Sequence, residues 1–411
     1  MKDLCLRLAA LEPWVVGTAV FLSVLSERLL PFATCLGLLC WVVRWAATGR
    51  PSQSSPIDLP VLALVLAGLV SLLCSPLPDA SLPQALRLLC GLLLCYSLIN
   101  WADTVQRISL LLGSLLALAL GMAAGALFFV DWANKFNFLP VILPNITTLV
   151  FSESVNPNVM GGILALLAIG ITAFLAFRWS ALRPLARVGL AAALLAIYGV
   201  VVLTQSRTAM LALAAALGLL VLLYYRRGWV VVGLGLGLAA VLVVQAGPKQ
   251  VWEDLGGVTG GTATFTRREQ IWTRAEVIFQ DFPLTGIGMG TFSQVTDAVF
   301  PLGPNPVLIP HAHNLYLQIA VDLGLPGLAT WLACFIVVIF MAWQLYRGEN
   351  RILQGLGAAI LCAQCALGVH GLLDAVTWDT RPAVIVWVLW GMTAAAWRIN
   401  RSHIAMPNED S

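Results

Sequence analysis

The chain has 411 residues, of which 60% are hydrophobic and only 10% are charged. A soluble domain carries about 25% charged residues, so this composition excludes an ordinary soluble protein and indicates a membrane protein. The formal net charge of +3 decides little, because the placement of Lys and Arg matters more than their sum in a membrane protein.

Apolar runs of about 20 residues recur along most of the chain, and a run of this length can cross a bilayer as a helix. They predict an all-α polytopic membrane protein with about 12 transmembrane helices in one integral membrane domain, residues 1–411. The first two spans are the hardest to separate, because only Ser26-Glu27-Arg28 divides them. In chain order the expected spans are 14–27, 29–46, 57–74, 81–99, 106–130, 158–178, 185–204, 208–225, 229–246, 325–346, 352–373 and 382–398.

The basic residues predict the orientation of these spans. Cytoplasmic loops carry an excess of Lys and Arg, and most of the 23 basic residues fall on one side when the N-terminus is placed inside. The residues on that side are Lys2, Arg7, Arg44, Arg50, Arg107, Arg178, Arg183, Arg187, Arg226, Arg227, Arg347, Arg351, Arg398 and Arg401. We therefore expect both termini to be cytoplasmic.

Two longer polar segments then fall on the outer side. The smaller runs over 131–157 and the larger over 247–324. Because every inner loop is short, we expect the working face of the protein to be the outer one.

The larger segment has the pattern of a surface helix. Thr266-Arg267-Arg268-Glu269 fits a capping box, which predicts a helix from Thr266 to about Gln280. The Pro and Gly residues of 281–288 then end it. Arg268 shares one face of this helix with Trp272, Ala275 and Phe279, so its charge is expected to point toward packed structure and an anionic partner.

A second short helix is expected at about 312–322, outside the hydrocarbon, with Gly324 at its end and Pro326 in the first turn of the next span. The segment His311-Ala-His313-Asn314 opens it. A histidine titrates near neutral pH and can remove a proton from a substrate. His313 is therefore a candidate general base, and the alternative is a helix-end histidine bonded to loop carbonyls.

Two histidines two residues apart also raise the question of a metal. On a helix this spacing points the rings apart, and the segment has no nearby carboxylate cluster. We therefore expect no metal and no other cofactor.

Several arginines on the expected outer side are candidate anion ligands. Arg207 follows Thr204-Gln-Ser206 in a tight turn, where free N–H groups of the next helix would add to its charge, although it could also simply extend into solvent. Arg268 could instead pair with a neighbouring glutamate. Arg267 is expected to be solvated and remains a secondary candidate. Arg381 and Asp374 are expected to pair with each other or to help line the site.

These residues resemble the O-antigen ligase and Wzy-type polymerase superfamily of bacterial membrane glycosyltransferases. His313-Asn314, nine residues and then Gly324-Leu-Pro-Gly327 match the ligase pattern His-[Asn/Ser/Gln]-x9-Gly-x-x-[Gly/Thr/Tyr] without a gap. Arg268-x3-Trp272, leading into Asp281-Phe-Pro-Leu-Thr-Gly-Ile-Gly288, resembles the outer-loop block of the family. Thr204-Gln-Ser-Arg207 resembles its arginine at the outer end of a middle span. The specific part of the resemblance is confined to about 200–330.

The resemblance implies a GT-C-like architecture with short helices in the large periplasmic loop, in a multi-pass protein of the bacterial inner membrane. It implies transfer of a glycan from undecaprenyl diphosphate to a sugar hydroxyl of lipid A–core on the periplasmic face. The mechanism would be inverting and metal-independent, in lipopolysaccharide biosynthesis. His313 would be the base and Arg207 and Arg268 the diphosphate ligands, with His311 and Asn314 as secondary candidates. The partners would be these two substrates and membrane lipids, without nucleic acid.

Other functions remain open at this point. A Wzy-like polysaccharide polymerase and a protein O-oligosaccharyltransferase share the same chemistry and differ in the acceptor. A solute transporter would more often carry ionisable groups near the middle of the membrane, which the expected spans lack. A non-catalytic scaffold or channel is the last alternative.

Overall fold

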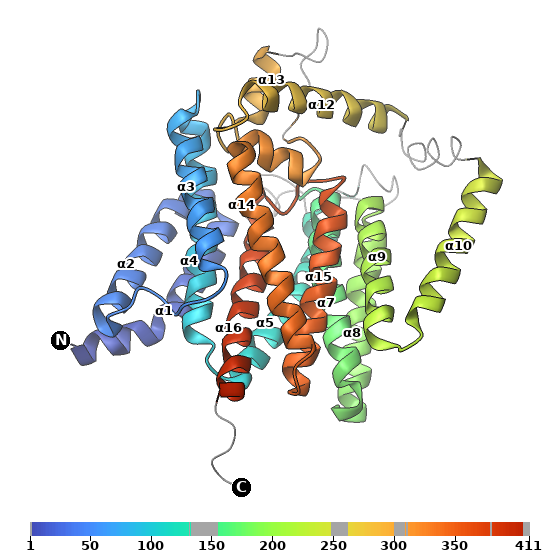
Figure 1. Cartoon of the computed structure of the whole chain (residues 1–411), viewed down its shortest axis with the longest axis horizontal. Coiled ribbons are helices and arrows are strands. Elements are labelled where there is room, and N and C mark those ends of the chain that lie inside the picture. Colours follow the sequence, from blue (N-terminus) through green and yellow to red (C-terminus); the bar gives the residue numbers. More distant parts are fainter. Residues whose placement is uncertain are drawn as a thin grey trace.

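The structure is a computed structural model that describes residues 2–130, 132, 155–247, 262–299, 309, 311–378 and 380–405. Every regular element among these residues is a helix (Figure 1). The helices are α1 (Lys2–Leu25), η1 (Glu27–Leu29), α2 (Leu30–Thr48), α3 (Asp58–Cys74), α4 (Pro78–Trp101), α5 (Val105–Phe129), α7 (Pro157–Arg178), η2 (Trp179–Ala181), α8 (Pro184–Leu203), α9 (Arg207–Tyr224), α10 (Gly228–Ala246), α12 (Thr262–Asp281), α13 (Phe292–Val299), α14 (Leu315–Tyr346), α15 (Arg351–Gly371), η3 (Arg381–Ala383) and α16 (Val384–Ala405).

The expected all-α membrane architecture is confirmed, and each of the expected spans coincides with a helix. Among the described residues, 10 helices are long and apolar enough to cross a membrane. The helices at the first and third expected spans have shorter apolar stretches, Ala9–Leu25 and Asp58–Cys74. Length and composition therefore support a polytopic protein without establishing the count of twelve.

The core of the bundle lies around α7 and α15, which pack against each other and bury most of their side chains. In α10, by contrast, only Gly228 is buried. Large apolar side chains cover the flanks, and Leu185 is 85% exposed and Leu73 76%. Soluble proteins rarely expose apolar surfaces of this extent. These flanks therefore indicate contact with the hydrocarbon core of a membrane.

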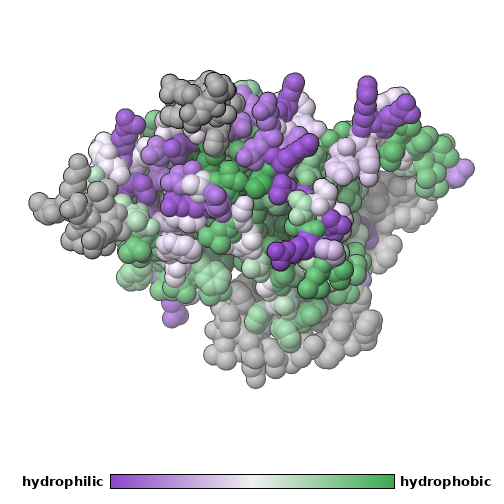
Figure 2. Space-filling view, turned by 90° about the horizontal axis from the view of Figure 1, so that it is seen from below, coloured by the Kyte–Doolittle hydropathy of each residue, from purple (hydrophilic) through white to green (hydrophobic). Residues whose placement is uncertain are grey.

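The two ends of the bundle differ. α12 lies across one end (Figure 1), which we call the site face because His311–Asn314 also lies there. At the other end short connections join the helices, and Arg398 of α16 donates to the carbonyl of Ile99 in α4 and to Oε1 of Gln53 in the loop between α2 and α3. Figure 2 views this opposite end, where hydrophilic side chains gather over the helix ends.

The polar segments differ in part from expectation. Most of 131–157 and residues 248–261 lie outside the described residues. α12 begins at Thr262, so Thr266 lies within the helix and the expected capping box is wrong as its start. α13 was not predicted at all, because its eight residues are too short for a clear periodic pattern.

The expected break at Gly324 is confirmed. Its φ of 69° and ψ of −175° interrupt α14 in a region that essentially only glycine occupies. The turn after α12 docks on this break: the N–H of Leu325 donates to Pro283 O at 2.7 Å, and the N–H of Ile287 donates to Val321 O at 2.9 Å. The turn after α12 and the break in α14, which both contain glycine, are thus joined by backbone hydrogen bonds. These bonds bring α12 against the start of α14.

Replacing Gly324 with Ala is expected to lower the thermal unfolding midpoint of the purified protein. A Cβ would lie 2.6 Å from the backbone carbon of Leu284, and the left-handed backbone adds about 1–3 kcal/mol of strain. Gly113→Ala in α5 is the matched control, because a Cβ there meets nothing within 4 Å. Equal midpoints for the two variants would contradict the proposed docking.

Candidate functional site

The histidine segment forms a tight turn directly before α14. α14 begins at Leu315, and Oδ1 of Asn314 caps it by accepting the N–H of Leu317 at 3.0 Å. His313 therefore precedes the helix, with a φ of 49°, and the expected helix start at about 312 is wrong. The N–H of His313 donates to Nδ1 of His311 at 3.2 Å, which stabilises this left-handed turn.

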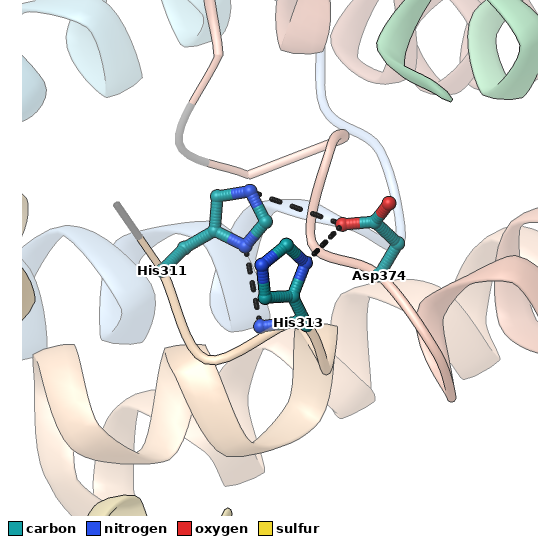
Figure 3. Close-up of side chains that lie close together, drawn as sticks. All are labelled: His311, His313 and Asp374. Atoms are coloured by element: carbon teal, nitrogen blue, oxygen red, sulfur yellow. Dashed lines mark hydrogen bonds and ion pairs between the residues drawn. The ribbon is translucent and has the colours of Figure 1, made fainter. Parts of the chain in front are cut away.

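The two imidazoles consequently lie together and do not diverge. Their ring centroids are 4.3 Å apart (Figure 3). The expectation that the two rings point apart assumed that the segment is helical. It is wrong because the segment is not helical.

Asp374 faces both rings from the loop that follows α15 (Figure 3). Its Oδ1 lies 3.3 Å from Nδ1 of His313 and 3.8 Å from Nε2 of His311. The N–H of Ala375 donates to the same oxygen at 2.9 Å. Burial favours the neutral acid, but the bond to His313 and the nearby histidines outweigh it and hold the pKa of Asp374 below its usual range. The sequence placed Asp374 either as a partner of Arg381 or as a residue that helps to line the site. The pairing is wrong, because Arg381 binds Glu27.

The hydrogen bonds assign the two ring nitrogens of His313. With Asp374 ionised, Nδ1–H of His313 donates to the carboxylate, which leaves the lone pair of Nε2 available. The His313 side chain is 31% exposed, so a ligand can reach it. This arrangement can accept a proton at Nε2 and stabilise the resulting imidazolium.

His311 has a different environment. Burial and the neighbouring His313 outweigh Asp374 and lower the pKa of His311 to about 4. His311 is therefore neutral at pH 7, and its Nδ1 supports the backbone of His313. Asn314 is likewise structural: besides capping α14, its Nδ2 donates to Leu372 O at 3.0 Å, which ties the histidine turn to the Asp374 loop.

Arg268 is held next to this cluster by α12. Nε1 of Trp272, on the same helix face, donates to the carbonyl of Ala312, between the two histidines, at 3.0 Å. Ala275 on that face is fully buried, so the expected inward orientation of the face is confirmed. Burial lowers the pKa of Arg268, Asp374 opposes this effect and Arg207 adds to it. Arg268 therefore lies within electrostatic reach of both residues.

Arg207 is the first residue of α9. Ser206 caps the helix by accepting the N–H of Ala209. The turn before it packs closely on α7, where a Cβ on Gly161 would lie 2.5 Å from Oγ1 of Thr204. Arg207 and Arg268 are far apart in sequence, yet the fold brings them into one electrostatic environment.

Of the secondary candidates, Arg381 lies elsewhere on the site face, where its Nε is 3.2 Å from Glu27 Oε1. The side chain of Arg267 lies outside the described residues. His370 is a neighbour that sequence reasoning did not select. It is 4% exposed, interacts electrostatically with Asp374 and Arg268, and its Nε2 has no hydrogen-bond partner among the described residues. Its position four residues before Asp374, at a helix end, is the signal that could have identified it.

His311, His313 and Asp374 could in principle hold a metal, since their ligand atoms lie within 4.8 Å of one another. The reasons given above against a metal are therefore wrong in part, because the rings converge and a carboxylate is present. Arg268 and its neighbour Arg207 still disfavour a divalent cation at this place.

Comparison with known families supports a function for this arrangement. Residues 190–332 match the family model described as O-antigen ligase. The matched part contains Arg207, Arg268 and the histidine turn, and it confirms the resemblance predicted from these residues. Asp374 lies outside it. No curated protein matches the chain.

Proposed function

We propose, from the O-antigen ligase match over residues 190–332, that this protein transfers a glycan from undecaprenyl diphosphate to a sugar hydroxyl of lipid A–core. The observation that carries the proposal is the convergence of His313, Asp374 and Arg268 at one end of a membrane bundle. A proton acceptor beside fixed positive charge suits the attack of a hydroxyl on a carbon whose leaving group is a diphosphate.

In the proposed reaction, Nε2 of His313 removes the proton from the acceptor hydroxyl while its oxygen attacks the anomeric carbon. The bond from that carbon to the diphosphate oxygen breaks, and undecaprenyl diphosphate leaves with the electron pair. A single displacement of this kind inverts the configuration of the anomeric carbon. Arg207 and Arg268 bind the diphosphate and stabilise the negative charge that develops on it.

Asp374 acts through His313 as a positioning residue. Its carboxylate fixes the tautomer that leaves Nε2 free, and it stabilises the imidazolium that forms when the proton arrives. His311 and Asn314 hold the turn in which His313 sits.

The exposed apolar flanks suit the polyprenyl tail of the donor, which would remain in the hydrocarbon. In this proposal the protein lies in the bacterial inner membrane with both termini in the cytoplasm. The site face is then periplasmic, and the arginine-bearing opposite end is cytoplasmic, as the positive-inside rule requires.

The proposal is tested with the purified protein, an undecaprenyl-diphosphate glycan and lipid A–core, in parallel reactions with and without EDTA. We expect joined product at an undiminished rate, because the two arginines replace the charge of a metal. Loss of the reaction in EDTA and its recovery with a divalent cation would contradict the metal-independent mechanism. If a second glycan repeat or a peptide reacts and lipid A–core does not, the protein is a polymerase or an oligosaccharyltransferase.

Asp374→Asn is expected to reduce the transfer rate by up to about 10⁴-fold, as does loss of the aspartate that fixes the tautomer of the histidine in a Ser-His-Asp triad. The same substitution made in a His313→Ala background should have almost no further effect on the rate. An equal loss in both backgrounds would indicate a purely structural Asp374.

A further inference from the structure

A fully buried carboxylate in α14 has no role in the proposed reaction. Asp322 and Gln318, which lies one helical turn before it, are both 0% exposed. Burying a charged group away from water is costly unless hydrogen bonds compensate for the lost hydration. The two oxygens of this carboxylate accept hydrogen bonds from two different parts of the site, and these bonds suggest what it does.

The backbone of Asp322 is fixed by other elements. In an α-helix its carbonyl would accept the N–H of the residue four positions later, but that residue is Pro326, which has no N–H. Instead, Oγ of Ser71 in α3 donates to this carbonyl at 2.5 Å, and the N–H of Gly288 donates to it at 3.2 Å. The carboxylate therefore projects from a point that α3 and the turn after α12 hold in place.

One carboxylate oxygen reaches the loop that carries Asp374. Nε1 of Trp378 donates to Oδ2 of Asp322 at 2.9 Å. The N–H of Trp378 donates to Ala375 O at 3.1 Å, and the N–H of Ala375 donates to Oδ1 of Asp374 at 2.9 Å. Consecutive hydrogen bonds thus join Asp322 to the carboxylate that faces His313.

The other carboxylate oxygen reaches the histidine turn. Nε2 of Gln318 donates to Oδ1 of Asp322 at 2.8 Å, and Oε1 of Gln318 accepts the N–H of Ala312 at 2.6 Å. The orientation of the Gln318 amide is fixed, because only its oxygen can accept an N–H. Ala312 stands between the two histidines, and its carbonyl accepts Nε1–H of Trp272 at 3.0 Å. Both the N–H and the carbonyl of Ala312 are therefore held.

We propose that Asp322 is a positioning residue that sets the placement of His313 relative to Asp374, an inference that rests on the proposed function. The histidine turn and the Asp374 loop are far apart in sequence and face each other at the site (Figure 3). Asp322 accepts a hydrogen bond from the supports of each. Relative displacement of the two would change the 3.3 Å contact between Nδ1 of His313 and Oδ1 of Asp374. Misplacement by about 1 Å can lower a rate by about 10²-fold.

The first variant in the test is Asp322→Asn, made in the full chain. Asparagine keeps the shape of the side chain, but its amide nitrogen faces a donor, either Trp378 or Gln318. If Gln318 rotates its amide to accept from this nitrogen, its own nitrogen faces the N–H of Ala312. We expect the maximal transfer rate to fall about 10²-fold. The KM for the donor should change little, because the diphosphate ligands are not displaced.

The double variant Gln318→Glu/Asp322→Asn exchanges the positions of the charge and the amide. One oxygen of the carboxylate at position 318 can accept the N–H of Ala312, and the other can accept the asparagine amide, whose oxygen accepts Trp378. Each hydrogen bond of the original arrangement is kept. Gln318→Glu alone places two carboxylates side by side and should lose both rate and thermal midpoint. The double variant should regain most of both.

Tyr346→Phe is the control for stability alone, because it removes the 2.7 Å bond from the Tyr346 hydroxyl to Leu223 O at the far end of the same helix. Its midpoint should fall while its rate per folded molecule stays near that of wild type. In a His313→Ala background, Asp322→Asn should have almost no further effect on the rate. An equal loss in both backgrounds, or a double variant that regains the midpoint without the rate, would overturn the proposal.

The midpoints separate this inference from the proposed function. If the wild-type chain transfers no glycan, the proposed function fails. A midpoint that falls in each single variant and recovers in Gln318→Glu/Asp322→Asn would then still support the link that Asp322 makes between the two segments. A midpoint that does not recover would overturn it.

Discussion

Replacing His313 with Ala is expected to lower the rate of glycan transfer by about 10²–10⁴-fold, the usual contribution of a positioned base. The loss follows from the geometry of Nε2, whose lone pair is available in the tautomer whose Nδ1–H donates to Asp374. Single-turnover rates at saturating concentrations of both substrates measure this effect separately from binding. Affinity for the donor should change little, since His313 is not assigned to the diphosphate.

The conformation of His313 calls for a second variant. At a φ of 49° an alanine adds strain of its own, whereas asparagine occupies this region more readily. His313→Asn should therefore keep the turn and still lose the base. A wild-type rate in His313→Asn would contradict the proposed role, and a normal thermal midpoint with a lost rate would support it.

Removing the Arg268 guanidinium is expected to cost about 10²–10³-fold in transfer, comparable to losing one preorganised donor to a developing oxyanion. Arg268→Lys should recover only part of the rate, because an ammonium keeps the charge but not the paired donors. Rates and donor affinity measured over a series of donor concentrations would separate ground-state binding from stabilisation of the transition state.

Arg274→Ala is the matched control for Arg268. It removes the same charge from the same helix, but the electrostatic partner of Arg274 is Asp297, away from Asp374. We expect its rate to stay within about twofold of wild type, as for a surface substitution. Equal losses in the two variants would mean that α12 acts through its overall charge and that Arg268 has no specific role.

Features of the fold that depend only on residues close together in the sequence could be predicted from the sequence. Apolar runs of about 20 residues predict helices because a bilayer leaves few other ways to satisfy the backbone. Gly324 marks a break because no other residue suits its backbone angles, and Trp272 identifies the buried face of α12 through helical spacing. The roles of His313, Arg207 and Arg268 were likewise suggested by local motifs.

What the chain alone did not reveal depends on contacts between distant segments. Asp374 reaches His313 only because α15 ends beside the histidine turn, and nothing in the local sequence of either residue indicates that pairing. For the same reason Arg381 was assigned to Asp374, its near neighbour in sequence, when its partner is Glu27. Side-chain identity and helical spacing specify which groups are present and which way a helix face turns. Only the packing of α4, α9, α12, α14 and α15 decides which charges meet, because electrostatic and hydrogen-bond energies depend on distance in space and not on separation along the chain.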